Sequence, residues 1–156
     1  MPSNTSAVLV SKAAEPKISI KLSTTYKMNS TMKTPLSQQA KEFRAGFQVM
    51  NSTTPASRTL QRTLIVEEFK EFLDAENQLI KGYTVNASEC LKELADLVYV
   101  CYQYAENLGW DLDEALNRVH VSNMSKLGPD GQPIRREDGK VLKGPNYQPP
   151  NLNDLV

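Results

Sequence analysis

Hydrophobic residues recur along the middle of the chain at the three- and four-residue spacing of amphipathic helices. This spacing begins at Thr34-Pro35, where threonine can cap a helix and proline fits the first helical turn. After a loop at 51–54, a helix is predicted from Pro55 to about residue 80, and Gly82 ends it. The same reasoning predicts a third helix over 86–108 and a fourth over 111–128. The chain is therefore expected to be all-α, with four helices.

The two ends of the chain differ from this helical middle, which spans residues 34–128. Residues 1–33 are rich in Ser, Thr and Lys and predict a flexible extension. A secretory signal is not expected there because no continuous apolar stretch is present, whereas a transit peptide or a later start codon stays open. Residues 129–156 carry Asp138-Gly139 between two short strand-like runs, which predicts a hairpin followed by an extended arm.

Charge and composition exclude several classes of protein. The chain has 156 residues with 18 basic and 18 acidic side chains, so bulk positive charge does not favour nucleic acid as a partner. No apolar run approaches the roughly 18 residues needed to cross a bilayer, and a cytoplasmic location is expected. Two cysteines and one histidine exclude a disulfide scaffold and most histidine-based metal sites.

Acidic residues interrupt the apolar stripe of the second predicted helix. On a helical wheel with Leu60 at the origin, Glu67, Glu68 and Glu71 fall in or beside the arc expected to be buried. On the third helix Glu93 and Asp96 are three residues apart and share one side. Ionised carboxylates are rarely buried unless they are paired or bind a metal. If the two helices face each other, these acids form a cluster of hard oxygen ligands that suits Mg²⁺ or Mn²⁺.

The fourth predicted helix carries polar residues on its apolar stripe. Asn123 lands in the middle of the stripe and Lys126 lies alongside it. Side chains of these types can hold the oxygens of a phosphate chain, and a metal would bridge the phosphates and orient a water. Each feature also has an ordinary structural explanation, because charged residues are common on solvated helix faces and a buried Asn is often only a paired polar group.

The combination of segments resembles a known family. The run Val66–Glu71 followed by Glu93-Leu94-Ala95-Asp96 resembles the EExxE…ExxD signature of the all-α nucleoside triphosphate pyrophosphohydrolases. That group includes the MazG proteins, the dimeric dUTPases, the dCTP pyrophosphatases and phosphoribosyl-ATP pyrophosphohydrolase. Residues 41–47, 119–128 and 136–147 also resemble segments of the small MazG-like enzymes of bacteria and phages. The resemblance covers roughly residues 36–152.

This resemblance implies a fold, a reaction and a set of site residues. The fold is a four-helix MazG-like bundle that assembles as a dimer or tetramer, with base pockets partly formed by a neighbouring chain. The reaction converts a nucleoside triphosphate and water to the monophosphate and pyrophosphate, with Mg²⁺, or Mn²⁺ in its place, and more than one ion per site. The residues matching the family's metal ligands are Glu68, Glu71, Glu93 and Asp96. Glu67 matches a position that binds a further metal or orients the water.

The resemblance also assigns substrate contacts. Asn123 and Lys126 match an Asn-x-x-Lys element that contacts substrate phosphates, and the basic tail residues Arg135 and Lys143 are expected to fold toward phosphates of the same or an adjacent subunit. The loops 47–55 and 82–86 are candidate walls of the base pocket. A canonical deoxynucleotide such as dGTP, dUTP or dCTP is the favoured substrate.

Three alternatives stay open from sequence alone. A di-iron carboxylate bundle is disfavoured because it needs Glu-x-x-His pairs, and Asn117 stands three residues before His120. Phosphoribosyl-ATP could replace the deoxynucleotide as substrate. A non-catalytic helical module could oligomerise and use the acids only as a solvated face.

Overall fold

The computed structural model describes residues 34–82 and 87–156, so the predictions for residues 1–33 and for most of the loop 82–86 lie outside the described residues. The described part contains four α-helices and one short 3₁₀ turn, and no strand forms in it. The elements are α1 (Leu36–Gly46), α2 (Pro55–Ile80), α3 (Ala87–Leu108), α4 (Leu112–Met124) and η1 (Asn153–Leu155). The predicted all-α class is confirmed. No helix among these residues is long and apolar enough to cross a membrane.

Helix starts follow the local signals in the sequence. The side chain of Thr54 accepts a hydrogen bond from the backbone N–H of Ser57, and Pro55 occupies the first turn of α2. Asp111 caps α4 in the same way, with its Oδ1 accepting from the N–H of Glu114 at 3.0 Å. These side chains satisfy backbone donors that have no partner inside the helix.

Two boundaries differ from the sequence prediction. Pro35 holds the N-cap position of α1, one residue later than predicted, and forms no side-chain capping bond. The last helix ends at Met124 rather than Gly128. There the N–H groups of Lys126 and Leu127 donate to carbonyls only three residues back, which tightens the chain into a turn.

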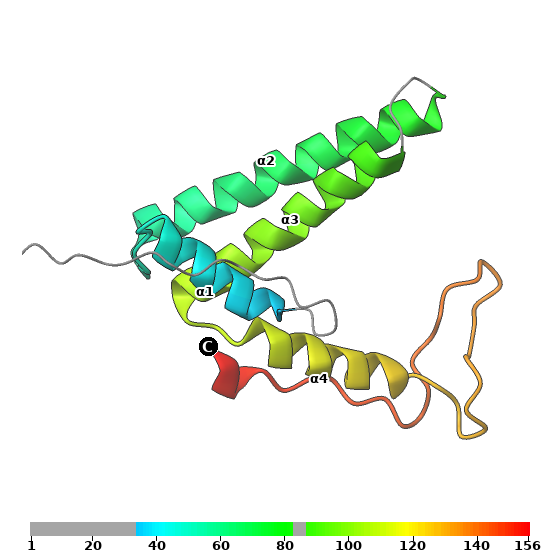
Figure 1. Ribbon diagram of the computed structural model, residues 1–156. Coiled ribbons are helices and arrows are strands. Elements are labelled where there is room, and N and C mark those ends of the chain that lie inside the picture. Colours follow the sequence, from blue (N-terminus) through cyan, green and yellow to red (C-terminus); the bar gives the residue numbers. More distant parts are fainter. Residues whose placement is uncertain (1–33, 83–86) are drawn as a thin grey trace, which may run out of the picture. The chain divides into compact units, whose positions relative to one another are not determined.

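The long helices α2 and α3 lie side by side and run antiparallel, and α1 packs against the end of this pair where α2 begins and α3 ends (Figure 1). Polar contacts between two residue pairs fix the register between the long helices. Ser57 pairs with Asn107 near one end, and the Cys90 thiol donates to Glu76 at 3.0 Å near the other. Along this seam, residue numbers therefore rise in α2 while they fall in the facing stretch of α3.

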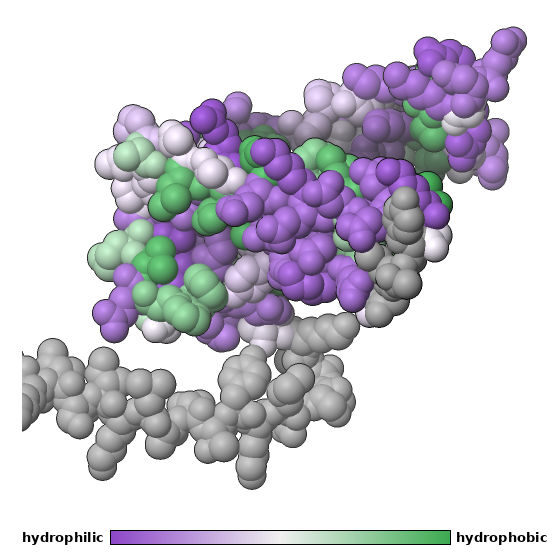
Figure 2. Space-filling model, turned by 90° about the horizontal axis from the view of Figure 1, so that it is seen from above, coloured by the Kyte–Doolittle hydropathy of each residue, from purple (hydrophilic) through white to green (hydrophobic). Residues whose placement is uncertain are grey.

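The apolar core of this chain is small. Only six hydrophobic residues of the described part are buried, and α2 buries just Gln61 and Ala75. The expectation that Leu60 lies in a buried arc is wrong, since it is 59% exposed. Periodicity identifies apolar positions, but it does not say which of them another element covers. Several green apolar patches accordingly reach the surface between hydrophilic residues (Figure 2).

A buried polar network joins α1, α3 and the loop between α1 and α2. Asn107, less than 2% of its surface exposed, accepts from Arg44 at 2.7 Å and donates to the carbonyl of Ser52 at 2.7 Å. Arg44 also donates to the side chain of Asn51 and to the carbonyl of Met50. Burial lowers the pKa of the Arg44 guanidinium, and the negative charge of Glu106 opposes that effect. The network therefore fixes the loop that leads into α2.

The C-terminal arm runs back along α4. The hydroxyl of Ser122 donates to the carbonyl of Gln148, and Arg118 donates to the Asn151 carbonyl and to both carboxylate oxygens of Asp154. Before the arm, the predicted hairpin is reduced to a single antiparallel bridge between Arg135 and Val141, since this segment protrudes from the helices (Figure 1). In the part of the chain that the structure describes, no other β-bridge stabilises it.

The arm crosses the end of α4 at a close approach. The N–H of Gly144 donates to the carbonyl of Lys126 at 2.9 Å. A β-carbon at Gly144 would stand 2.6 Å from the Leu127 carbonyl oxygen and 2.7 Å from that of Lys126. Both neighbours are backbone atoms, so only glycine fits at this crossing.

Replacing Asn107 with alanine should lower the free energy of unfolding by about 3 kcal/mol, because the buried Arg44 guanidinium loses an acceptor and the Ser52 carbonyl loses its donor. Urea denaturation followed by circular dichroism measures this change. Asn117→Ala, on the exposed surface of α4, is the matched control and should change stability by less than about 0.5 kcal/mol. Equal stability of the two variants would show that the network does not hold the fold.

The arm should loosen in acid. The hydrogen bonds from Arg118 lower the pKa of both Asp154 and Glu114 below their usual values of 3.8 and 4.5. Groups with a lowered pKa in the folded state stabilise it above their usual pKa and lose that effect as the pH falls through the lowered value. The NMR signal of the Asp111 amide, which donates to the Leu155 carbonyl, should therefore shift in this acidic range.

Arg118→Ala should abolish this acid-dependent shift, because protonation of the two carboxyls then has no Arg118 ion pair to break. Arg136→Ala removes a comparable ion pair with Asp138 in the hairpin, which does not touch the arm, and should leave the shift unchanged. A shift that persists in Arg118→Ala would contradict the role given to this arginine.

Candidate functional site

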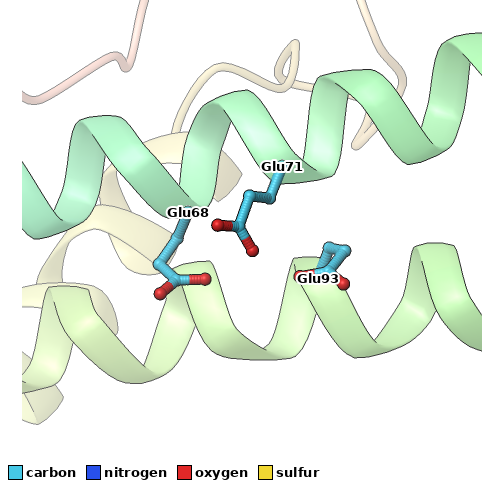
Figure 3. Close-up of side chains that lie close together, drawn as sticks. All are labelled: Glu68, Glu71 and Glu93. Atoms are coloured by element: carbon cyan, nitrogen blue, oxygen red, sulfur yellow. The ribbon is translucent and has the colours of Figure 1, made fainter.

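Three of the four acids predicted as metal ligands on the second and third helices lie close together. Glu68 and Glu71 of α2 and Glu93 of α3 each offer a carboxylate oxygen, and these three oxygens lie within 4.8 Å of one another. Figure 3 shows the side chains in the space between the two helices. The antiparallel packing of α2 and α3 places Glu93 opposite the i, i+3 pair of Glu68 and Glu71. We call Glu68, Glu71 and Glu93 the acid cluster.

Negative charges meet in the acid cluster. Glu68 and Glu93 are half-buried and Glu71 is exposed. Partial burial raises the pKa of Glu68, and the negative charges of Glu71, Asp96 and Glu93 raise it further, whereas Lys92 lowers it. Carboxylates at this separation repel one another unless a cation lies between them. Carboxylate oxygens are the donors that hard divalent cations prefer, so these residues fit Mg²⁺ or Mn²⁺.

Asp96 lies beside the acid cluster and is paired with a lysine. Its charge acts on Glu68, and its Oδ2 lies 2.9 Å from Nζ of Lys92. The same ammonium lies 3.1 Å from both carboxylate oxygens of Glu93. The sequence reasoning missed Lys92, although its i, i+4 spacing to Asp96 on one helix was a readable signal.

The other predicted site residues do not join the acid cluster within this chain. Glu67 is exposed, and a position adjacent to Glu68 on a helix points about 100° away from it. Lys126 donates to Oδ1 of Asn123 at 2.7 Å at the end of α4, which packs on α1 and η1.

The two basic tail residues bond locally. Arg135 donates to the carbonyl of Gly139, and Nζ of Lys143 lies 4.2 Å from the ring centroid of Tyr147. Among the residues that the structure describes, no hydrogen bond or ion pair links these two side chains, or Asn123 and Lys126, to the acid cluster. Their contact with substrate phosphates stays a prediction.

The loop between α1 and α2, one of the two candidate walls of a base pocket, presents apolar side chains to solvent. Phe47 and Met50 are 70% and 84% exposed. Phe47 stacks on Phe43 with ring centroids 4.4 Å apart, and Phe43 meets the edge of Tyr99, one turn beyond Asp96 on α3. Through Phe43 the loop therefore packs against α3, the helix that carries Glu93 and Asp96. Its role in base binding stays a prediction.

A cavity of about 640 Å³ lies elsewhere in the described part, where the start of α1 meets the end of α3 and the start of α4. Ser37 and Tyr102 line it and both donate to Asp113, with a Tyr102–Asp113 distance of 2.8 Å. Its acidic side chains already serve as helix caps and hydrogen-bond acceptors in the fold. The carboxylates best placed to hold a divalent cation are therefore those of the acid cluster rather than those of this cavity.

A comparison with protein-family models identifies the family of this chain. The family model of phosphoribosyl-ATP pyrophosphohydrolase matches residues 27–123. The crystal structure of a candidate NTP pyrophosphohydrolase from Exiguobacterium sp. 255-15 is 28% identical and covers 76% of this chain and 90% of its own, with a TM-score of 0.41. No curated protein matches the chain. The family match spans more than half of the sequence and includes all four predicted metal ligands, and the chain therefore belongs to the phosphoribosyl-ATP pyrophosphohydrolase family of MazG-like, all-α nucleotide pyrophosphohydrolases.

Proposed function

We propose that this pyrophosphohydrolase converts a deoxynucleoside triphosphate and water to the monophosphate and pyrophosphate, and that it depends on Mg²⁺ or Mn²⁺. The observation that carries the proposal is the convergence of Glu68, Glu71 and Glu93, with Asp96 beside them. A triphosphate carries about four negative charges, and it cannot approach this acidic site unless cations lie between the two.

Each acid has a role in this proposal. Glu68, Glu71, Glu93 and Asp96 would hold the divalent cations, with more than one ion per site. A bound cation neutralises the phosphate chain and lowers the pKa of a coordinated water. Glu67 would orient that water from the rim of the site. Asn123, Lys126, Arg135 and Lys143 would bind phosphate oxygens, and because they bond locally in this chain, a second copy is the simplest source of them.

The substrate has two candidates. A canonical deoxynucleotide such as dGTP, dUTP or dCTP is favoured by the resemblance to the small MazG-like enzymes. Phosphoribosyl-ATP is favoured by the description of the matching family. Both substrates present a triphosphate chain whose phosphoanhydride bond is broken, so the acid cluster serves either one, and the groups that contact the base decide between them.

A homo-oligomer, either a dimer or a tetramer, is part of the proposal. On α2 a second apolar stripe, opposite the face that meets α3, is formed by Val66, Phe69, Leu73 and Ile80, which are 39% to 73% exposed. Leu91, Leu94 and Val98 form a similar outward stripe on α3. Two contiguous stripes of this length exceed the scattered apolar residues of an ordinary surface, and pairing with another copy would cover them.

Glu71→Gln and Asp96→Asn should each reduce pyrophosphate release by about 100-fold or more, because each removes one charged ligand of the cation. The helical circular dichroism spectrum should not change, since neither residue lies in the core. Release would be measured with Mg²⁺ and with Mn²⁺ across all NTPs, all dNTPs and phosphoribosyl-ATP.

Asp74→Asn is the matched control for this test. It removes one negative charge from an exposed position of α2 outside the acid cluster and should retain activity. Chelation should abolish the activity of the wild type, and added Mg²⁺ should restore it. Full activity in Glu71→Gln would remove the acid cluster from the mechanism, and a preference for phosphoribosyl-ATP would replace the deoxynucleotide.

Phe69→Asp together with Leu73→Asp should dissociate the oligomer, because it places charge in the middle of the outward stripe of α2. Light scattering coupled to gel filtration measures the mass. Val121→Asp, at an exposed apolar position of α4 outside the two stripes, is the control and should leave the mass unchanged. A monomeric wild type would refute the proposed assembly.

A further inference from the structure

Lys92 occupies a distinctive place beside the acid cluster. Its ammonium lies 2.9 Å from Oδ2 of Asp96 and 3.1 Å from both oxygens of Glu93. These are two of the four carboxylates that the proposed function gives to the divalent cations. Among the described residues, no other lysine or arginine pairs with Glu68, Glu71, Glu93 or Asp96.

We propose that Lys92 is an internal counter-ion that competes with the divalent cation for the carboxylates of Glu93 and Asp96 and is displaced when the cation binds. This inference rests on the proposed function, because it assumes that these carboxylates hold the cation. An ammonium group at hydrogen-bond distance from these oxygens repels a divalent cation that coordinates the same carboxylates. The two cations therefore exclude each other at these oxygens.

The structure makes this exchange easy. The side chain of Lys92 is 62% exposed, so its ion pairs stand in water and are weak. Its long stem lets the ammonium swing into solvent without moving α3. Between metal-binding events Lys92 reduces the repulsion among the acids, and this accounts for an ordered site on two helices whose facing side chains carry the same charge.

A purely structural role of Lys92 would have a different effect on metal affinity. If Lys92 only stabilised α3 through its i, i+4 pair with Asp96, removing it would weaken the helix slightly and leave metal affinity unchanged. If it held Glu93 and Asp96 in the geometry needed for coordination, removing it would weaken metal binding. Competition alone predicts tighter binding when the lysine is absent.

Calorimetric titration of the full chain with Mn²⁺ separates these cases. Lys92→Met should bind Mn²⁺ about tenfold more tightly than the wild type, because a positive charge next to the ion is removed. Lys70→Met is the matched control, since it removes the same charge from α2 on the side away from α3 and should change the affinity by less than about twofold. Equal or weaker binding by Lys92→Met would overturn the inference.

A second measurement detects the displacement itself. Acetylation of lysines by a soluble acylating reagent, read by mass spectrometry, should be slow at Lys92 in metal-free protein and several-fold faster with saturating Mn²⁺, whereas Lys70 should not change. An unchanged rate at Lys92 would overturn displacement even if the affinity rises. A wild type that binds no Mn²⁺ would refute the proposed metal site together with this inference, whereas Mn²⁺ binding without the Lys92 effects would refute the inference alone.

Discussion

Repulsion between carboxylates that face each other across α2 and α3 is the constraint around which this protein is built. A helix pair in water would normally bury apolar residues along its seam, and here the middle of the seam carries Glu68, Glu71 and Glu93. Such an arrangement lowers stability by itself, which is common where a site has been shaped for ligand rather than for packing. The hydrogen bonds near both ends of the seam, at Ser57–Asn107 and Cys90–Glu76, hold the helices together across this unfavourable stretch.

The rest of the fold supplies rigidity that the small core does not. Arg44 and Asn107 form a buried polar network of a kind that fixes one arrangement strongly when every partner is satisfied. On the other side of the molecule the C-terminal arm takes the place of another helix along α4, and Arg118 bonds to it at several points. Polar contacts therefore supply much of the stabilisation that apolar burial supplies in a larger domain.

Much of the fold follows from local sequence, because caps and helical spacing act over a few residues. Thr54 and Asp111 identify the starts of α2 and α4, and the i, i+3 spacing of the acids was enough to expect their convergence. The features that sequence did not reveal depend on distant partners. Arg44 and Asn107 lie 63 positions apart. Leu60 has the apolar character of a core residue, but only the packing of other elements decides whether it is covered.

In the candidate site, too, some features follow from local sequence and others depend on neighbouring side chains. Composition and spacing indicate which side chains can hold a cation, because ligand chemistry belongs to the residues themselves. The competing ion pair of Lys92 and the local bonding of Lys126 to Asn123 depend on rotamers and neighbours, which no periodicity encodes. Family membership adds the reaction class but not the base.

The crossing at Gly144 has a consequence for how the C-terminal segment could diversify. Carbonyl oxygens of Lys126 and Leu127 stand where any larger residue would place its first side-chain atom. A larger residue at position 144 would push the chain away from the end of α4. The contacts that the C-terminal arm makes after this position would then be lost together. We therefore expect insertions to be accommodated in the protruding hairpin before the glycine, whereas the path after it depends on the glycine as a whole.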